Sequence, residues 1–333
     1  MKYVAPILFA IALIPAFVSA QTPSIQDVIN SAVSLTVTPS TPGPNQNVIA
    51  VLQSSSIDLD TSIITWKLNG KTEHSGQGSK SFNFTSGPVG SQTTVSAVIA
   101  ESGGGSLTES ATISPAEVDL MWEGEGYIPP FYEGRAMWAH EGQITLFAVP
   151  HVLNANGTPI NPNTLIYKWI QNDTVLGDSS GAGKNSLVLN DTILSLPQAI
   201  EVDVLTSGNV TVATQSINLA PSDPQLLVYE DNPLYGVLFN REAGSQFNAL
   251  SKEFSFTALP LFFSAVGRNS NNLSYNWEAG GATSGTGSKV TYSTPDAGTG
   301  SAEVSVSINS STFVTQSATR NFLVQFGNQA STF

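Results

Sequence analysis

Apolar and polar residues alternate along three stretches of the chain that stand about 100 residues apart. Their apolar positions are Val95, Ala97 and Ile99; Ile200, Val202 and Val204; and Val304, Val306 and Ile308. Successive side chains of a strand point to opposite faces of a sheet, so a period of two is typical of a half-buried strand. The pattern therefore predicts three strands that each place one face in a core and the other in water.

A tryptophan stands 27 to 31 residues before each of these strands. Trp66, Trp169 and Trp277 lie in strand-like runs that end in Asn69-Gly70, Asn172-Asp173 and Gly280-Gly281. Turn residues of this kind tolerate the positive φ that tight hairpins need. The tryptophans are 103 and 108 residues apart, which predicts three copies of one unit with a buried tryptophan in each.

Each unit has room for about seven short strands in roughly 100 residues, a count typical of a β-sandwich. We therefore predict an all-β chain of three tandem domains, with bounds at 33–115, 116–221 and 222–328. A tryptophan on a central strand before a hairpin resembles the immunoglobulin-like superfold, including its polycystic-kidney-type (PKD-like) variants. The Trp-x-Phe-Gly-Asp-Gly core of the PKD type is absent, and no cysteine pair brackets the tryptophan. The resemblance implies the fold and no particular function.

The second and third units each contain an aromatic segment broken by proline, predicted as inserts at 119–138 and 228–243. Trp122 and Tyr229, which are 107 residues apart, are predicted to correspond, as are Val149-Pro150 and Leu259-Pro260. These segments resemble an uncharacterised family of exported proteins from small-genome bacteria, and the resemblance implies no activity. The aromatic residues concerned are Trp122, Tyr127, Phe131, Tyr132, Trp138, Tyr229, Tyr235 and Phe239. They would staple neighbouring domains together, form a protein interface or stack against sugars.

The N-terminal residues predict an export signal. Lys2 precedes a charge-free apolar run over 4–18, and Val18-Ser19-Ala20 provides a small-x-small cleavage site. The run is shorter than the roughly 20 residues that span a bilayer, so we predict a signal peptide over 1–20 and no membrane span in the mature chain. Residues 21–32 form a leader that is either a short helix or frayed, and 329–333 form a tail. The predicted location is secreted, extracellular or cell-surface.

Composition narrows the class of protein. Only 11% of the 333 residues are charged, the net charge is −13 and there is no cysteine. A nucleic-acid binder needs clustered Lys and Arg, so this balance argues against one. The absence of cysteine excludes a disulfide scaffold and a cysteine nucleophile, and an exported chain without cysteine fits a bacterial producer.

Motifs for catalysis and metal binding are weak. Among the histidines His74, His140 and His151, none belongs to a His-Glu-x-x-His motif, and there is no Gly-x-Ser-x-Gly elbow. We therefore predict no enzyme and no cofactor. Acidic residues near the two later domain boundaries suggest a possible calcium site, with a solvated acidic turn as the alternative. The candidate calcium ligands are Glu117, Asp119, Asp223, Glu230 and Asp231.

These observations predict an exported, non-enzymatic protein with a cell-surface structural or adhesion role. Its partner would be a cell-envelope or appendage protein, or a surface glycan. One alternative is an array of carbohydrate-binding modules, which requires that Trp122, Trp138 or Tyr229 be exposed. The second alternative is a secreted hydrolase, which requires a pocket with convergent carboxylates or histidines.

Overall fold

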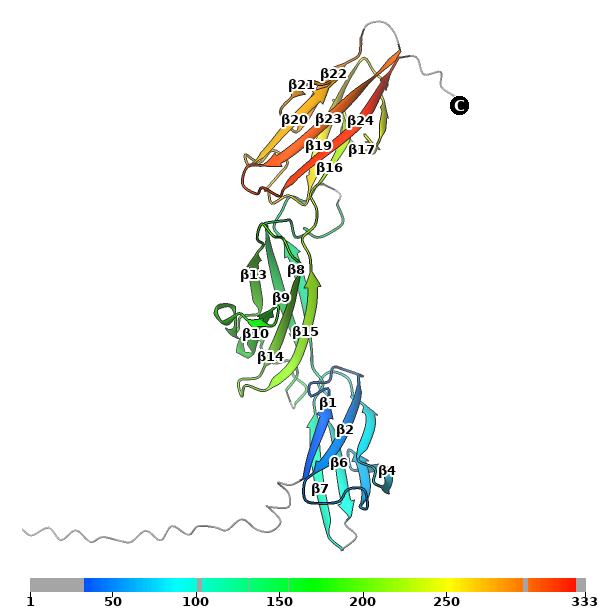
Figure 1. Ribbon diagram of the computed structural model, residues 1–333, viewed down its shortest axis with the longest axis vertical. Coiled ribbons are helices and arrows are strands. Elements are labelled where there is room, and N and C mark those ends of the chain that lie inside the picture. The colour runs from blue at the N-terminus through cyan, green and yellow to red at the C-terminus, as the bar shows by residue number, and fades with distance from the viewer. Residues whose placement is uncertain (1–32, 101–103, 131, 155, 296–298, 328–333) are drawn as a thin grey trace, which may run out of the picture. The chain divides into compact units, whose positions relative to one another are not determined.

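The computed structural model describes residues 33–100, 104–130, 132–154, 156–295 and 299–327 (Figure 1). The predicted signal peptide, the leader and the tail lie outside these residues. Within the described ranges, no helix is long and apolar enough to cross a membrane.

The first sandwich consists of seven strands in two sheets. The strands are β1 (Val33–Thr38), β2 (Asn47–Ser54), β3 (Ile63–Leu68), β4 (Lys71–Gln77), β5 (Ser81–Thr85), β6 (Thr93–Ala100) and β7 (Ser106–Ile113). One sheet has the order β1-β2-β5 and the other the order β4-β3-β6-β7.

The second sandwich repeats this plan. Its strands are β8 (Glu117–Gly124), β9 (Gln143–His151), β10 (Ile166–Gln171), β11 (Thr174–Val175), β12 (Gly181–Ala182), β13 (Ser186–Asn190), β14 (Gln198–Leu205) and β15 (Thr211–Leu219). The sheet orders are β13-β9-β8 and β11-β10-β14-β15, with β12 also paired to β10. Two short 3-10 turns, η1 (Pro162–Thr164) and η2 (Gly177–Ser179), lie in its connections.

The third sandwich has the same plan and two additional strands. Its strands are β16 (Gln225–Asn232), β17 (Gly236–Glu242), β18 (Gln246–Asn248), β19 (Glu253–Leu261), β20 (Leu273–Ala279), β21 (Ala282–Gly285), β22 (Lys289–Ser293), β23 (Gly300–Ser310) and β24 (Ser317–Phe326). The sheet orders are β17-β16-β19-β22 and β18-β24-β23-β20-β21. The additional strands are β17, which forms a hairpin with β16, and β18, which runs parallel to β24.

All three sandwiches share one topology. With the additional strands β17 and β18 set aside, the first two strands of each sandwich and the strand that follows the central hairpin form one sheet, and the other strands form the second sheet. An immunoglobulin constant domain places its fourth strand in the first sheet, whereas here that strand pairs with the tryptophan-bearing third strand. The prediction of an all-β chain of three tandem immunoglobulin-like sandwiches is thus confirmed, with the fourth strand on the other sheet.

Each sandwich has its own apolar core, and each core contains the tryptophan of the third strand at 0% exposure. The indole N–H of each tryptophan donates to a backbone carbonyl just beyond the following hairpin. The three hydrogen bonds run from Trp66 to Ser79 (2.7 Å), from Trp169 to Lys184 (2.9 Å) and from Trp277 to Gly287 (2.8 Å). This contact ties the hairpin to the core, because a buried indole N–H needs an acceptor.

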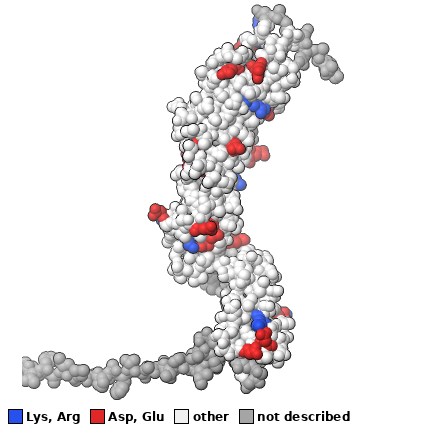
Figure 2. All heavy atoms as spheres, in the orientation of Figure 1, with Lys and Arg blue, Asp and Glu red and all other residues white. Residues whose placement is uncertain are grey.

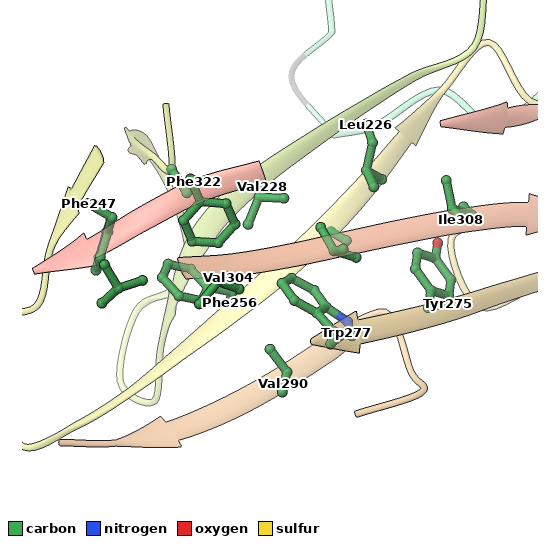
Figure 3. Close-up of a cluster of buried hydrophobic side chains, with 14 of the residues drawn as sticks. Leu226, Val228, Phe247, Phe256, Tyr275, Trp277, Val290, Val304, Ile308 and Phe322 are labelled. Atoms are coloured by element: carbon green, nitrogen blue, oxygen red, sulfur yellow. The ribbon is translucent and has the colours of Figure 1, made fainter. Parts of the chain in front are cut away.

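Figure 3 shows the third core, where Trp277 lies among side chains from both sheets. The ring of Phe256 is stacked on that of Trp277 at 6.5 Å between centroids. Phe322 meets Phe256 edge-on at 5.1 Å. The aromatic residues of this core therefore bridge the two sheets by ring contacts in addition to area burial.

The aromatic segments predicted as inserts begin inside strands. Glu117–Gly124 is the first strand of the second sandwich, and the third sandwich uses Gln225–Asn232 and Gly236–Glu242 as a hairpin. The prolines at 129–130 and at 233 follow the first strand of their sandwich. The part of the first segment that lies outside a strand is the long connection 125–142.

The register corrects the predicted correspondence of Trp122 with Tyr229. Val118 pairs with Pro150 and Leu226 pairs with Pro260, so the two prolines do correspond. Counting along the strands from these pairs aligns Tyr229 with Met121. A shift of one residue reverses the face of a strand, which is why Trp122 packs against its core while Tyr229 lies on an outer face.

We predict that Trp277→Ala lowers the free energy of unfolding of the third sandwich by about 3–5 kcal/mol, because it leaves a cavity and an unpaired Gly287 carbonyl. Hydrogen exchange of the β23 amides, resolved by mass spectrometry, measures this domain separately from the others. Leu250→Ala is the control, since Leu250 is 77% exposed and its substitution should change stability by less than about 0.5 kcal/mol. Equal effects of the two substitutions would contradict the role assigned to Trp277.

Candidate functional site

The connection between β8 and β9, residues 125–142, reaches from the second sandwich to the third. The later part of the connection, near Ala136, runs back to the end of β8, where the Gly124 N–H donates to the Ala136 carbonyl at 2.8 Å. A Cβ at Gly124 would lie 2.2 Å from the Met137 carbonyl oxygen, so the close approach requires glycine there. Trp138 anchors the end of the connection in the second core, with 2% exposure and an N–H donated to the Gly142 carbonyl.

The outer part of the connection touches the third sandwich. A Cβ at Gly126 would lie 2.7 Å from the Phe263 carbonyl oxygen, and one at Gly142 would lie 2.4 Å from the Ser264 hydroxyl. Both glycines therefore allow backbone to approach the connection between β19 and β20. The linker between the two sandwiches makes a further contact with the connection, because the Ser222 N–H donates to the Trp138 carbonyl at 2.7 Å.

A buried glutamine joins the two sandwiches through hydrogen bonds. Gln316, in the turn between β23 and β24, is 1% exposed. Its amide N–H donates to the His140 carbonyl and to the Ser264 hydroxyl, and its amide oxygen accepts from the Ser264 N–H at 2.8 Å. The side chain thus joins three loops: its own turn and the loop of Ser264 in the third sandwich, and the loop of His140 in the second.

A carboxylate makes the second polar contact of the junction. Glu141 accepts hydrogen bonds from the N–H and the hydroxyl of Thr315, at 2.7 and 2.6 Å. The hydrogen bonds from Thr315, first that of its side chain, lower the pKa of Glu141, and the nearby His140 acts in the same direction. Glu141 stands in a turn with φ +57°, and its own N–H donates to Asp191 at 2.8 Å.

An open apolar groove of about 240 Å³ lies on the outer face of the first sheet of the third sandwich. Its lining comes from β16, β17 and β19 and from the connection 125–142. The lining residues are Pro129, Pro130, Tyr132, Leu227, Tyr229, Phe239, Leu259 and Leu261. The Tyr229 and Phe239 rings are 5.4 Å apart and tilted by 57°, so the groove offers both ring edges and ring faces. Figure 2 shows that charged side chains are sparse on the visible surface.

The structure separates the predicted aromatic residues into three groups. Trp138 is a core residue, and Trp122 packs on the second core beneath the Arg135 guanidinium, which lies 4.0 Å from its ring centroid. Tyr132, Tyr229 and Phe239 come together in the groove. Tyr127 is half-buried beside the groove, Tyr235 is exposed at the tip of the β16–β17 hairpin, and Phe131 lies outside the described residues.

The acidic residues predicted as calcium ligands are not brought together. Asp119 pairs with His151 at 2.9 Å, and Asp223 pairs with His140 at 3.0 Å. Glu230 pairs with Arg241, while Asp231 accepts from Thr257 and pairs with Lys289 at 3.1 Å. Glu117 is exposed at the start of β8. In the described parts of the chain, no group of three or more His, Asp or Glu residues is placed to hold a metal ion.

The histidines form no catalytic arrangement with the neighbours described. His140 and His151 each pair with one aspartate, and His74 lies exposed on β4. Neither His–Asp pair has a hydroxyl nucleophile as a further hydrogen-bond partner among the residues described. Gln316, Glu141 and Thr315 escaped the sequence analysis because isolated polar residues in loops carry no pattern, and their roles depend on a contact between distant segments.

No family model matches the chain, and no curated protein matches it. Several solved structures are similar in fold. The central fibronectin-III array of RIM-binding protein is 12% identical, with 89% of this chain and 96% of that chain covered and a TM-score of 0.29. Three N-terminal domains of the outer capsid protein Hoc of bacteriophage RB49 are 11% identical, with coverage of 90% and 99% and a TM-score of 0.26.

A structure of a 1.5-MDa bacterial ice-binding adhesin is 10% identical, with 89% of this chain and 98% of that chain covered and a TM-score of 0.22. At this level of similarity nothing about function follows from these neighbours.

We expect Gln316→Ala to weaken the attachment of the connection 125–142 to the third sandwich. The substitution leaves the His140 carbonyl and the Ser264 N–H without this partner, which costs about 1–3 kcal/mol when groups stay buried. Hydrogen exchange of amides at 136–142 should accelerate, while that of β14 should not. Gln225→Ala, at an exposed strand position, is the matched control, and faster exchange at 136–142 in that variant as well would argue against the bridging role of Gln316.

The lowered pKa of Glu141 predicts a pH-dependent contribution to stability. The contribution of Glu141 to the free energy of unfolding is fully present above the usual pKa of a glutamate side chain, about 4.3. It is lost as the pH falls through the lower pKa that Glu141 has in the folded state. The melting temperature of Glu141→Gln should therefore lie below that of the unmodified chain at pH 7, and the two should converge as the pH drops below about 4.3. Scanning calorimetry from pH 3 to pH 7 measures the gap. A gap that stays constant across this range would rule out the carboxylate as its origin.

Proposed function

We propose that the protein is an exported, non-enzymatic surface protein with a structural or adhesion role, and that the groove over β16, β17 and β19 is a surface through which it contacts a partner. The observation that carries the proposal is this open hollow with three aromatic side chains and two prolines in its lining. It lies on a domain whose other apolar aromatic residues are mostly packed into the core.

The physical properties of the groove suit recognition of another macromolecule. Tyr and Phe supply large contact areas with few rotatable bonds, and such residues are enriched where protein surfaces meet. The two prolines and the packing of the connection 125–142 against the third sandwich limit the freedom that a partner would have to remove on binding. These properties support binding at the groove.

The export part of the proposal rests on the N-terminal sequence. A charged residue, an apolar run and a small-x-small site occur in the order that a signal peptidase reads. We infer that the mature protein is held at the cell envelope or at a surface appendage.

A carbohydrate-binding role is the second candidate, and the rings of Tyr132, Tyr229 and Phe239 favour it. Aromatic rings that line an open groove can stack against the apolar faces of sugars. Two tryptophans considered for this role are less suitable, because Trp138 is buried and Trp122 is covered on one side by Arg135. A glycan ligand would therefore bind at the groove of the third sandwich.

The proposal predicts that the protein occurs on intact producing cells, where added protease removes it, and that the purified chain binds isolated envelopes. Tyr229→Ala with Phe239→Ala should reduce envelope binding at least tenfold, about 1.4 kcal/mol, because both rings line the groove. Leu194→Ser, a change at a residue that is 73% exposed on the second sandwich, should leave binding unchanged.

Competition and fractionation decide between the candidates. Pretreatment of envelopes with protease should abolish binding if the partner is a protein, whereas competition by released envelope glycans would favour the carbohydrate-binding alternative. Recovery of the protein from the medium alone, with no binding to envelopes, would overturn the surface role.

A further inference from the structure

The outer face of the first sheet of the second sandwich carries an exposed apolar patch. Four side chains form it: Met121 on β8 (54% exposed), Phe147 and Val149 on β9 (37% each) and Val188 on β13 (50%). Met121 stands directly opposite Phe147 in the register, Val149 is two residues from Phe147 on the same face, and Val188 is diagonal to it. The four side chains are therefore contiguous, and such patches on a folded domain mark interaction sites.

The chain itself shows what covers such a face. In the third sandwich, Leu259 takes the place that Val149 has in the second, and Tyr229 takes the place of Met121. Leu259 is only 1% exposed, and it lines a groove whose other wall is the connection 125–142. That connection joins the first and second strands of the preceding sandwich. The outer face of one sandwich is thus partly covered by the loop between the first two strands of its neighbour.

The third sandwich has a corresponding loop whose apolar side chains are exposed. It is the tip of the β16–β17 hairpin, where Leu234 is 85% and Tyr235 is 78% exposed. The tip has a defined shape, because the Asn232 side chain accepts from the N–H groups of Leu234 and Tyr235 at 2.9 and 3.2 Å. Two large apolar side chains held in water on an ordered turn are poised to bind with little loss of backbone entropy.

We propose that this tip, Leu234 and Tyr235, docks onto the patch of Met121, Phe147, Val149 and Val188 in a second copy of the chain. The tip cannot reach the patch of its own copy, since it lies at the far end of β16, a strand of eight residues and so about 27 Å from the linker. The contact joins two different surfaces and is therefore heterologous, so it can repeat from copy to copy in an open series.

The chemistry of the two surfaces is complementary. Leu234 and the Tyr235 ring would bury apolar area against Met121, Phe147 and the two valines. The rim of the patch supplies acceptors for the Tyr235 hydroxyl in the carboxylates of Asp119 and Glu123, which flank Met121 on the same face. A tyrosine at an interface is well suited to this combination of an apolar floor and a polar edge. This inference does not depend on export or adhesion.

The test uses the chain from Gln21 onward, the form expected after export, in sedimentation velocity over a range of concentrations. The unmodified chain should form concentration-dependent oligomers. A tip variant, Leu234→Ser with Tyr235→Ser, and a patch variant, Met121→Thr with Phe147→Thr, should each weaken self-association at least tenfold. Mixing these two variants should restore association as a 1:1 dimer and nothing larger, because one functional tip and one functional patch remain in the pair.

Leu194→Ser with Leu196→Ser is the control, since it removes two exposed apolar side chains from another loop of the second sandwich and should leave association unchanged. Circular dichroism and melting temperature check that each variant folds, and the single changes Tyr235→Ser and Phe147→Thr replace any double variant that does not. A monomeric unmodified chain at every concentration, a mixture without the 1:1 dimer, or equal loss in the control would overturn the proposal.

Discussion

A β-sheet has two faces, and a two-sheet sandwich buries only one face of each sheet. The inner faces of this chain are fixed by the tryptophan on the third strand, whose indole N–H is bonded to a carbonyl beyond the next hairpin in all three sandwiches. Because the inner faces are buried in the core, contacts with other parts of the chain or with other molecules depend on the residues of the outer faces. In the first sandwich the outward positions of the first two strands include Ser34, Thr36 and the exposed Ile49. In the second and third sandwiches, the outward positions of the second strand include the larger side chains of Phe147 and Leu259.

The junction of the second and third sandwiches shows how such a face is used. Its polar contacts are directional, and the bonds of Gln316 and Glu141 fix where the connection 125–142 sits. Its apolar contacts are not directional, and they bury Leu259 and Leu261 while leaving a hollow between Tyr132 and Tyr229. Hydrogen bonds on buried groups hold position because their loss costs about 1–3 kcal/mol each. The groove is therefore the space left where the connection is fixed in position but its apolar contacts with the third sandwich are incomplete.

Much of the fold could be predicted from the sequence because its determinants are local. The alternation at Val95, Ala97 and Ile99 and the turn at Asn69-Gly70 each specify a strand or a hairpin within a few residues. Which face of a strand points into the core is harder to predict from the sequence. Aligning Tyr229 with Trp122 instead of Met121 is an error of one residue, and this error exchanges the inner and outer faces of the strand. The acidic residues illustrate a further limit. Asp231 is drawn to Thr257 and Lys289 by strand pairing, and nothing in the spacing of the carboxylates reveals those partners.

An outer face is also a safer place for contact than a sheet edge. An exposed edge presents unpaired backbone groups that can add strands without limit, which leads to aggregation. In the third sandwich, both edge strands of the second sheet are short, since β18 has three residues and β21 has four. A contact made by side chains on a face, such as Phe147 with the hairpin tip of another copy, has a defined register set by shape and can dissociate. In such a contact the chain would associate through side chains, so a few substitutions could change the strength of association. The backbone groups of the edge strands would take no part in it.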